Sequence, residues 1–152
     1  MSVTNRKVLA VASTGGHWEQ LMLLRETLDK FDTRYATTDA RAARQRHIED
    51  AVIVPDCNLD RPLATLWCAL VSLWTVVRIR PQRIISTGAA PGLLMICAGR
   101  LVGAKTLWID SVANGERLSL SGRLAMRISH QCLTQWEHLS HETGAGYAGA
   151  VL

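Results

Sequence analysis

Short apolar runs alternate with longer amphipathic stretches along most of this chain. Each apolar run is two to five residues long and is bounded by polar residues, glycine or proline, which is typical of strands buried in a parallel sheet. On this pattern we expect strands at 8–12, 34–38, 51–54, 83–86, 105–109 and 131–134. Helical patterns predict helices at 18–28, 62–80, 93–102 and 121–129, with a polar, basic helix or surface loop at 40–49.

The alternation of strands and helices predicts the fold class. An α/β, Rossmann-like parallel sheet with helices on both faces is the architecture that such an order of elements favours. The chain shows neither an internal repeat nor a linker, so we expect a single domain over residues 1–152. The tail from His141 is rich in glycine.

The composition narrows the class of protein further. The chain has 152 residues, of which 48% are hydrophobic and 20% are charged, and this excludes long disorder and collagen-like repeats. Its formal net charge of +4 suits anionic partners such as lipid, nucleotide or phosphate groups. The basic residues do not form one stripe with interleaved aromatic residues, so no nucleic-acid partner is expected. Enzymes that join two large substrates mostly use two domains, and this length provides one.

Cysteine and histidine spacing gives no metal or redox motif. The chain has four cysteines, Cys57, Cys68, Cys97 and Cys132. None of them forms a CxxC pair, and we expect buried, reduced thiols. His138 and His141 have the spacing of a helical HxxH pair, but no carboxylate or cysteine pattern completes a metal site. We therefore expect neither a metal ion nor a bound cofactor.

The first apolar run ends in a glycine-rich turn at 13–17. Gly15 and Gly16 allow the backbone to approach a ligand closely, and the N–H groups of the following helix suit an anion. The turn is neither GxGxxG nor a Walker A loop, so a dinucleotide or ATP site has no support. His17 follows the glycines, and histidine exchanges protons near neutral pH, which makes it a candidate catalytic base. The alternative is a plain tight turn between a strand and a helix.

Two further turns follow strands of the same predicted sheet. The segment 87–92 has small residues that leave room for a ligand, or that only let a helix pack closely on its strand. Polar residues after the strand at 105–109 suit sugar hydroxyls, and some of them equally suit a solvated loop. Because the carboxyl ends of parallel strands share one edge, the three turns predict one ligand site. Its candidate residues besides His17 are Thr14, Gly15, Gly16, Thr87, Gly88, Asp110, Ser111, Asn114 and Glu116.

The segment 62–77 is unusual because its sixteen residues carry no charge. As a helix it would be about 24 Å long, which is short for the roughly 30 Å core of a bilayer. It is nevertheless apolar all round, although a helix of a small domain has only one face on the sheet. Trp67 and Trp74 lie on one side, and Arg78 and Arg80 follow the segment. We expect a helix on or shallowly in a membrane surface, or a helix whose outer face a protein partner covers.

Five motifs, taken in order along the chain, resemble one protein family. They are Ser-Thr-Gly-Gly-His-Trp-Glu-Gln-Leu at 13–21, Arg-Pro at 80–81 ahead of Ile-Ile-Ser-Thr-Gly at 84–88, Trp-Ile-Asp-Ser at 108–111, Leu-Ser-Leu-Ser-Gly-Arg-Leu at 118–124 and Gln-Trp-Glu at 135–137. The family is the membrane-recruiting subunit of the split N-acetylglucosaminyltransferase that extends dolichol-linked oligosaccharide, with bacterial counterparts in exopolysaccharide and capsule assembly. The first turn is also similar to that of the single-chain enzyme that makes peptidoglycan lipid II.

The resemblance implies half of an enzyme. Members of the family have a GT-B fold split into two polypeptides, and this chain corresponds to the N-terminal, acceptor-side half. A second subunit, the C-terminal half, would carry most of the site for the nucleotide-sugar donor. This half would bind the polyprenyl-diphosphate-linked sugar acceptor, with the family's Gly-Gly-His turn at Gly15, Gly16 and His17. The family more often has glutamate at the position of Asp110.

The resemblance also implies a place in the cell. Family members work at the cytoplasmic face of a membrane, and eukaryotic members usually begin with a transmembrane anchor. The start of this chain, 1–7, is polar and precedes an apolar run too short for a signal peptide or a span, so we expect peripheral or monotopic attachment to the inner membrane. Two other functions stay open at this point: a non-catalytic anchor that only recruits and activates its partner, and a stand-alone nucleotide-binding Rossmann enzyme.

Overall fold

A parallel β-sheet forms the centre of the molecule. The computed structural model describes residues 4–58 and 60–150. Its strands are β1 (Thr4–Ala12), β2 (Phe31–Thr37), β3 (Val52–Ile53), β4 (Arg83–Gly88), β5 (Lys105–Ile109), β6 (Gln131–Thr134) and β7 (Gly146–Tyr147). Within the described residues they form one sheet in the order β3-β2-β1-β4-β5-β6-β7, and every neighbouring pair is parallel.

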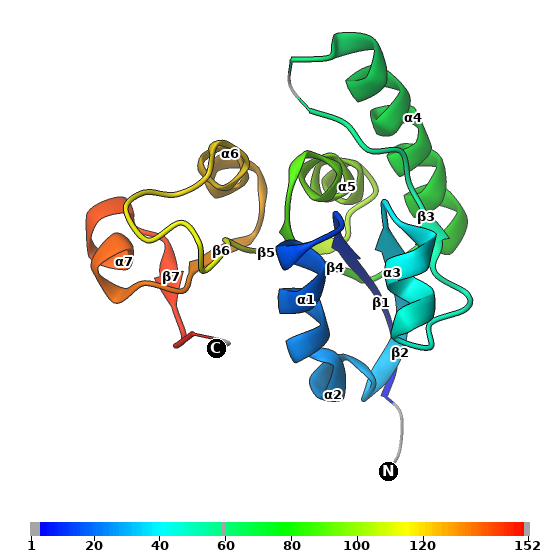
Figure 1. Ribbon diagram of the computed structural model, residues 1–152, viewed down its shortest axis with the longest axis horizontal. Helices are drawn as coiled ribbons and strands as arrows, with labels where there is room; N and C mark the ends of the chain where they lie inside the picture. Colours follow the sequence, from blue (N-terminus) through cyan, green and yellow to red (C-terminus); the bar gives the residue numbers. More distant parts are fainter. Residues whose placement is uncertain (1–3, 59, 151–152) are drawn as a thin grey trace.

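Helices pack on both faces of this sheet (Figure 1). They are α1 (Gly16–Leu23), α2 (Arg25–Leu28), α3 (Ala40–Gln45), α4 (Pro62–Ile79), α5 (Ala90–Leu101), α6 (Leu120–Ile128) and α7 (Glu137–Thr143). One hydrophobic cluster joins the sheet to α4, α5 and α6, and a second joins it to α1, α2 and α3. The predicted fold class, a Rossmann-like parallel sheet with helices on both faces, is confirmed.

The alternation of side chains along β1 builds both hydrophobic clusters. Leu9 and Val11 point to the face of α4 and α5, whereas Val8, Ala10 and Ala12 point to the face of α1. All five are at most 2% exposed, as expected for a central strand that is covered on both sides. This explains why the run reads as continuously apolar and not as alternating.

Most expected elements are present, with shifted ends. The strands at 105–109 and 131–134 have the expected bounds, and the helix expected at 18–28 is interrupted at Leu24. The prediction of a turn over 87–92 is wrong. Thr87 and Gly88 are the last residues of β4, and α5 already begins at Ala90. The sequence pattern did not indicate α7, which buries only Leu139, or the two-residue strand β7. The expectation for the polar start of the chain falls partly on residues 1–3, outside the described residues.

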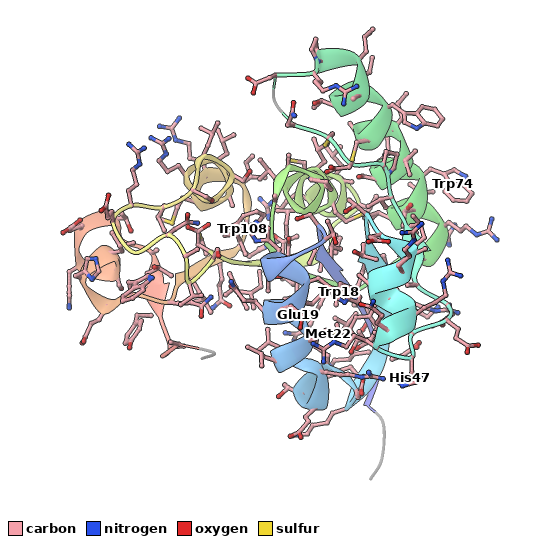
Figure 2. The ribbon with its side chains drawn as sticks, viewed as in Figure 1. Trp18, Glu19, Met22, His47, Trp74 and Trp108 are labelled. Carbon is pink, nitrogen blue, oxygen red and sulfur yellow. The ribbon has the colours of Figure 1, made fainter. Side chains whose placement is uncertain are left out.

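The helix α4 exposes large apolar side chains and buries two hydroxyl side chains, unlike an ordinary surface helix. Its buried residues are Cys68, Ser72, Thr75 and Val76. Its exposed large apolar residues are Leu63, Leu66, Trp67, Leu70, Leu73, Trp74 and Val77. Among the described residues, α4 is the one helix that is long and apolar enough to cross a membrane by length and composition. Figure 2 shows Trp74 on the side of α4 that faces away from the rest of the molecule.

Candidate functional site

The centre of the candidate site lies where the chain reverses its direction across the sheet. From β1 the chain moves outward to β2 and β3, and it then returns to β4 on the other side of β1. In open sheets of this type, ligands bind outside the carboxyl ends of the strands at such a switch point, here between the loops that follow β1 and β4. The two loops meet in a hydrogen bond, in which the N–H of Ser13 donates to the carbonyl of Gly88 at 3.0 Å.

His17 is held at this edge by a reciprocal pair of hydrogen bonds with Thr87. Its Nδ1 atom lies 2.9 Å from the carbonyl oxygen of Thr87, and the Thr87 hydroxyl donates to the carbonyl of His17 at 2.7 Å. Because a carbonyl can only accept, Nδ1 must carry the proton in this contact. The lone pair of the neutral ring is then on Nε2, the atom opposite this contact, which is the arrangement that a general base needs.

Gly88 supports the imidazole ring from the side of β4. A Cβ atom at this position would lie 2.6 Å from Cε1 of His17 and closer still to Nδ1. The backbone of Gly88 has φ +125°, a conformation that residues with a side chain rarely adopt. Glycine is therefore required at position 88 both by the close approach of His17 and by the backbone conformation.

The helices α1 and α5 begin at this edge without side-chain caps. Gly15, at φ +74°, precedes α1 and Ala89 precedes α5, and neither contributes a side-chain hydrogen bond. The neighbouring helix α6 differs, because the Ser119 hydroxyl accepts a hydrogen bond from the N–H of Gly122. The first N–H groups of α1 and α5 are thus available for an anion such as a phosphate group.

Asp110 is buried at the base of the loop that follows β5. It is 2% exposed, and its carboxylate accepts hydrogen bonds from Trp108 Nε1 at 3.1 Å and Asn114 Nδ2 at 3.2 Å. It also accepts from the N–H and hydroxyl of Ser119 at 2.9 and 2.6 Å. Its oxygens are therefore engaged within the protein. We assign Asp110, and Asn114 with it, to positioning this loop, in place of the direct ligand contact that the sequence suggested.

Two buried glutamines connect three loops of the site. The side-chain oxygen of Gln20 accepts from Gln135 Nε2 at 2.9 Å, and its amide nitrogen donates to the Ser111 hydroxyl at 3.0 Å. Gln135 also donates to the carbonyl of Asp110 at 3.0 Å. The network joins α1 to the ends of β5 and β6. The sequence did not indicate Gln20 or Gln135 as site residues, although they belong to the motifs at 13–21 and 135–137 that carry the family resemblance.

The remaining predicted residues divide between this edge and α4. Thr14 is exposed, and its N–H donates to the Thr38 hydroxyl at 3.1 Å. Glu116 is exposed in the loop after β5, and Trp136 Nε1 donates to the carbonyl of Val112 in the same loop at 2.8 Å.

On α4, Trp67 and Trp74 are each 59% exposed. The Arg78 guanidinium lies 5.1 Å from the centroid of the Trp74 ring, a cation–π contact. Arg80 ends the helix with a positive φ of 52°. Trp67, Trp74 and Arg78 thus lie along α4, away from the loops around His17, and Arg80 follows at the end of the helix.

The sequence matches one family model. Residues 25–151 match the model described as oligosaccharide biosynthesis protein Alg14 like. The chain is also 25% identical over 171 aligned residues to the UDP-N-acetylglucosamine transferase subunit ALG14 of Mus musculus, and the alignment covers 90% of this chain and 78% of the mouse protein.

Solved structures with the same fold are longer than this chain. Acinetobacter baumannii MurG superposes with a TM-score of 0.73 at 14% identity over 95% of this chain and 44% of MurG. The S. aureus MnaA–UDP structure gives 0.75 at 9% identity over 94% and 43%, and a UDP-N-acetylglucosamine 2-epimerase from Rickettsia bellii gives 0.75 at 12% over 97% and 46%. The chain thus spans less than half the length of each of these proteins.

Proposed function

Since the chain belongs to the family of Alg14-like oligosaccharide biosynthesis proteins, we propose that it is one subunit of a two-chain glycosyltransferase. The observation that carries this proposal is one Rossmann-like parallel sheet whose strand order reverses between β1 and β4, in a sequence without a nucleotide fingerprint. A GT-B site lies between two such domains, and this chain corresponds in size to one of them. A donor-binding subunit, equivalent to the C-terminal half, would complete the site.

The reaction we propose is transfer of a hexosyl or N-acetylhexosaminyl group from a nucleotide sugar to a polyprenyl-diphosphate-linked saccharide. Its product would serve the assembly of a polysaccharide or oligosaccharide, including bacterial exopolysaccharide. The partner subunit holds most of the donor, and this chain holds the acceptor. The proposed transfer uses no metal ion or cofactor, because its reacting groups are a hydroxyl, a base and a sugar diphosphate.

His17 is the general base in this proposal. The acceptor hydroxyl gives its proton to Nε2 while its oxygen attacks the anomeric carbon of the donor and the nucleoside diphosphate leaves. The resulting imidazolium keeps its Nδ1 proton on the Thr87 carbonyl, 2.9 Å away, which stabilises the charged ring. The same hydrogen bond fixes the ring orientation, so that Nε2 does not turn away from the acceptor.

The diphosphate of the acceptor binds, in this proposal, at the helix N-termini of the same edge. The free N–H groups that follow Gly15 and Gly16 supply hydrogen bonds and a partial positive charge. Thr14, Glu116 and the backbone around Thr87 and Gly88 border the same space. Asp110, Ser111 and Asn114 act on the acceptor indirectly, through the loop conformation that their hydrogen bonds hold.

The exposed face of α4 is the proposed membrane contact, on the cytoplasmic side of the inner membrane. This face carries only apolar residues between Arg61 and Arg78, and its two indoles suit the boundary between headgroups and acyl chains. The buried side of α4 packs against α5. This packing favours a helix that lies in the surface, with the domain still attached, over one that leaves the domain to span the bilayer.

Reconstitution with the partner subunit tests the two-chain proposal. The isolated chain is expected to transfer no sugar, and addition of the partner is expected to restore transfer. Robust transfer from a nucleotide sugar by this chain alone would overturn the split-enzyme proposal.

The variant His17→Ala tests the base. Transfer by the complex should fall by about 10²–10⁴-fold while the complex still forms. His141→Ala is the matched control, because His141 is exposed on α7, away from β1 and β4. Near-normal transfer by His17→Ala would place all of the chemistry on the partner, and this chain would then be a non-catalytic anchor and activator.

A further inference from the structure

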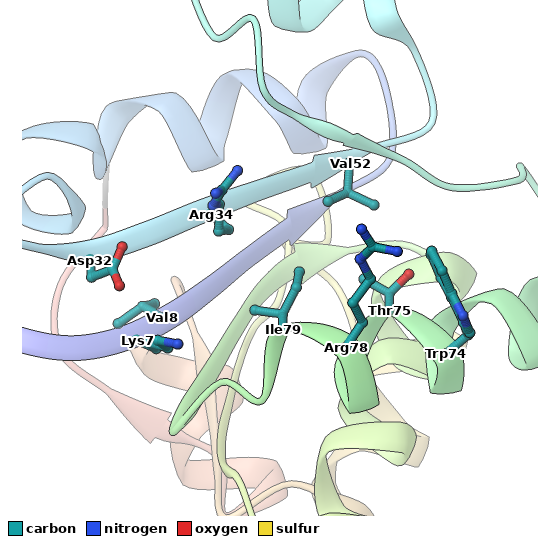
Figure 3. A pocket seen from close by; sticks show the side chains of 9 residues that line it. All are labelled: Lys7, Val8, Asp32, Arg34, Val52, Trp74, Thr75, Arg78 and Ile79. Carbon is teal, nitrogen blue, oxygen red and sulfur yellow. The ribbon is translucent and has the colours of Figure 1, made fainter.

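A polar cavity lies at the amino edge of the sheet, opposite the edge that holds His17. Its volume is about 510 Å³, within the range of small-molecule sites. Figure 3 shows its two walls: the starts of β1 and β2 on one side, and the last turns of α4 on the other. Neither the catalytic proposal nor the family resemblance uses this cavity.

The cavity wall carries three cationic side chains and one carboxylate. Lys7 and Asp32 are register partners on β1 and β2, yet within the described residues neither has an ion-pair partner. Arg34 pairs with Asp50 at 2.8 Å, outside the cavity wall. Arg78 contributes its guanidinium from α4. The wall therefore offers a net positive charge together with one separate acceptor for a cation.

Thr75 is the observation that points to a ligand. The residue lines the cavity and is 1% exposed, and its hydroxyl has no hydrogen-bond partner among the described residues. A buried hydroxyl without a partner costs about 1–3 kcal/mol, so an apolar residue of the same shape would be favoured there unless something binds the oxygen. Arg78 lies three residues further along the same helix, so both side chains face the same space.

Trp74 connects the cavity to the exposed face of α4. Its ring lines the cavity, and 59% of its surface is exposed on the face that carries Trp67 and Leu70. We propose that the cavity binds the phosphoethanolamine headgroup of a membrane lipid whose acyl chains lie along the exposed face of α4. This inference rests on the proposed membrane contact of α4.

The chemistry of the headgroup matches the wall group by group. Lys7 and Arg78 pair with the phosphate, and the Thr75 hydroxyl donates a hydrogen bond to a phosphate oxygen. Asp32 accepts hydrogen bonds from the primary ammonium group. A headgroup with a phosphate alone would leave Asp32 beside a second negative charge, and a phosphocholine group has no N–H to donate to it.

Vesicles that differ only in the zwitterionic lipid test the proposal. One set contains phosphatidylethanolamine and the other phosphatidylcholine, with the same fraction of phosphatidylglycerol, so that the surface charge is constant. The wild-type chain is expected to bind the phosphatidylethanolamine vesicles about tenfold more tightly in flotation. Asp32→Asn should lose this preference, and Thr75→Val should reduce it because the phosphate of the headgroup is held less tightly in the cavity. Arg127→Ala, which removes an exposed charge on α6, should keep it.

The thermal unfolding of each variant is measured to check that the variant is folded. Thr75→Val removes the unpartnered hydroxyl and should melt no lower than the wild type in the absence of lipid, so a loss of preference cannot be a loss of folding. Equal binding of the wild type to both vesicles, with unchanged behaviour of the variants, would overturn the headgroup site and leave membrane docking by α4 intact.

A soluble probe tests whether the cavity binds the headgroup in the absence of a membrane. Glycerophosphoethanolamine in solution should shift the NMR signal of the Thr75 methyl group, but not those of residues on α6. No vesicle binding and no shift would overturn both this inference and membrane docking. A shift without vesicle binding would overturn the lipid as the source and assign the cavity to a soluble phosphoethanolamine compound.

Discussion

Replacing Gly88 with alanine tests the geometry of His17 without changing His17 itself. The added Cβ atom would overlap the imidazole, with Cε1 at 2.6 Å and Nδ1 closer. Ordinary van der Waals contacts begin about 1 Å beyond this separation, so the ring must move by about that amount. The movement breaks the 2.9 Å hydrogen bond to the Thr87 carbonyl and releases the constraint on the tautomer.

The expected size of the effect follows from that displacement. A misplacement of about 1 Å in a catalytic group costs about 10²-fold in rate, and loss of the base altogether costs about 10²–10⁴-fold. Backbone strain at φ +125° adds about 1–3 kcal/mol to the cost in folding stability. We therefore expect kcat/KM of the two-chain complex to fall at least about 100-fold in Gly88→Ala.

Gly103→Ala is the matched control for strain. Gly103 also has a positive φ, +82°, but a Cβ atom there would meet nothing within 4 Å. Both variants should therefore lose stability, and only Gly88→Ala should lose transfer. The assay is sugar transfer by each folded variant with the partner, below the midpoint of its urea unfolding curve, with imidazole ¹⁵N shifts as the readout of the tautomer. If the two variants transfer equally well and the ¹⁵N shifts are unchanged, His17 is not positioned as we argue.

Three further predictions concern the membrane face, the buried amides and the thiols. Changing both Trp67 and Trp74 to serine should weaken vesicle partitioning by about 10²–10⁴-fold, because each is 59% exposed and burial of that share contributes about 1.5–3 kcal/mol per residue; unchanged flotation would contradict this. Gln20→Leu should lower the free energy of unfolding by about 2–3 kcal/mol, measured in urea, since it removes two buried hydrogen bonds. Burial raises the pKa of the Cys68 and Cys132 thiols from about 9 to about 12, so they should resist Ellman's reagent at pH 8 until the chain unfolds. The thiols of the unfolded chain ionise at a lower pH than the buried thiols. The stability that Cys68 and Cys132 contribute is therefore complete below about pH 9 and is lost as the pH rises toward 12. A free energy of unfolding that stays constant between these limits would refute the raised pKa values.

The elements that the sequence determined are those with a strong local pattern. The strands at 105–109 and 131–134 contain short apolar runs with polar boundaries, and their observed bounds agree with the prediction. The polar segment 137–143 and the pair Gly146–Tyr147 lack such a pattern. The first forms a helix that buries its own Leu139 beside β6, and the second forms an edge strand that pairs with β6, which are tertiary effects that local propensity does not contain.

The candidate site also has a part that the local sequence predicts and a part that only the fold determines. The order of strand, glycines and His17 is local, and residue order alone predicts a candidate base at the end of a strand. Contacts between distant residues needed the fold: His17 meets Thr87 across 70 residues, and Gln20 meets Gln135 across 115. The sequence suggested Asp110 as a ligand contact, but the fold surrounds it with donors from its own loop and so makes it a positioning residue.

The sequence by itself determined the class of fold, the strand-end position of His17 and the uncharged face of α4, since each depends on residue type and spacing along one segment. The tertiary structure decided which nitrogen of His17 is free, why position 88 must be glycine, and that Thr75 is buried without a partner, among the described residues, beside a charged cavity. These depend on the register of parallel strands and on the packing of α4 across the starts of β1 and β2. Hydrophobic patterning selects the face of an element that is buried, but only the assembled sheet sets the distances between side chains on different elements.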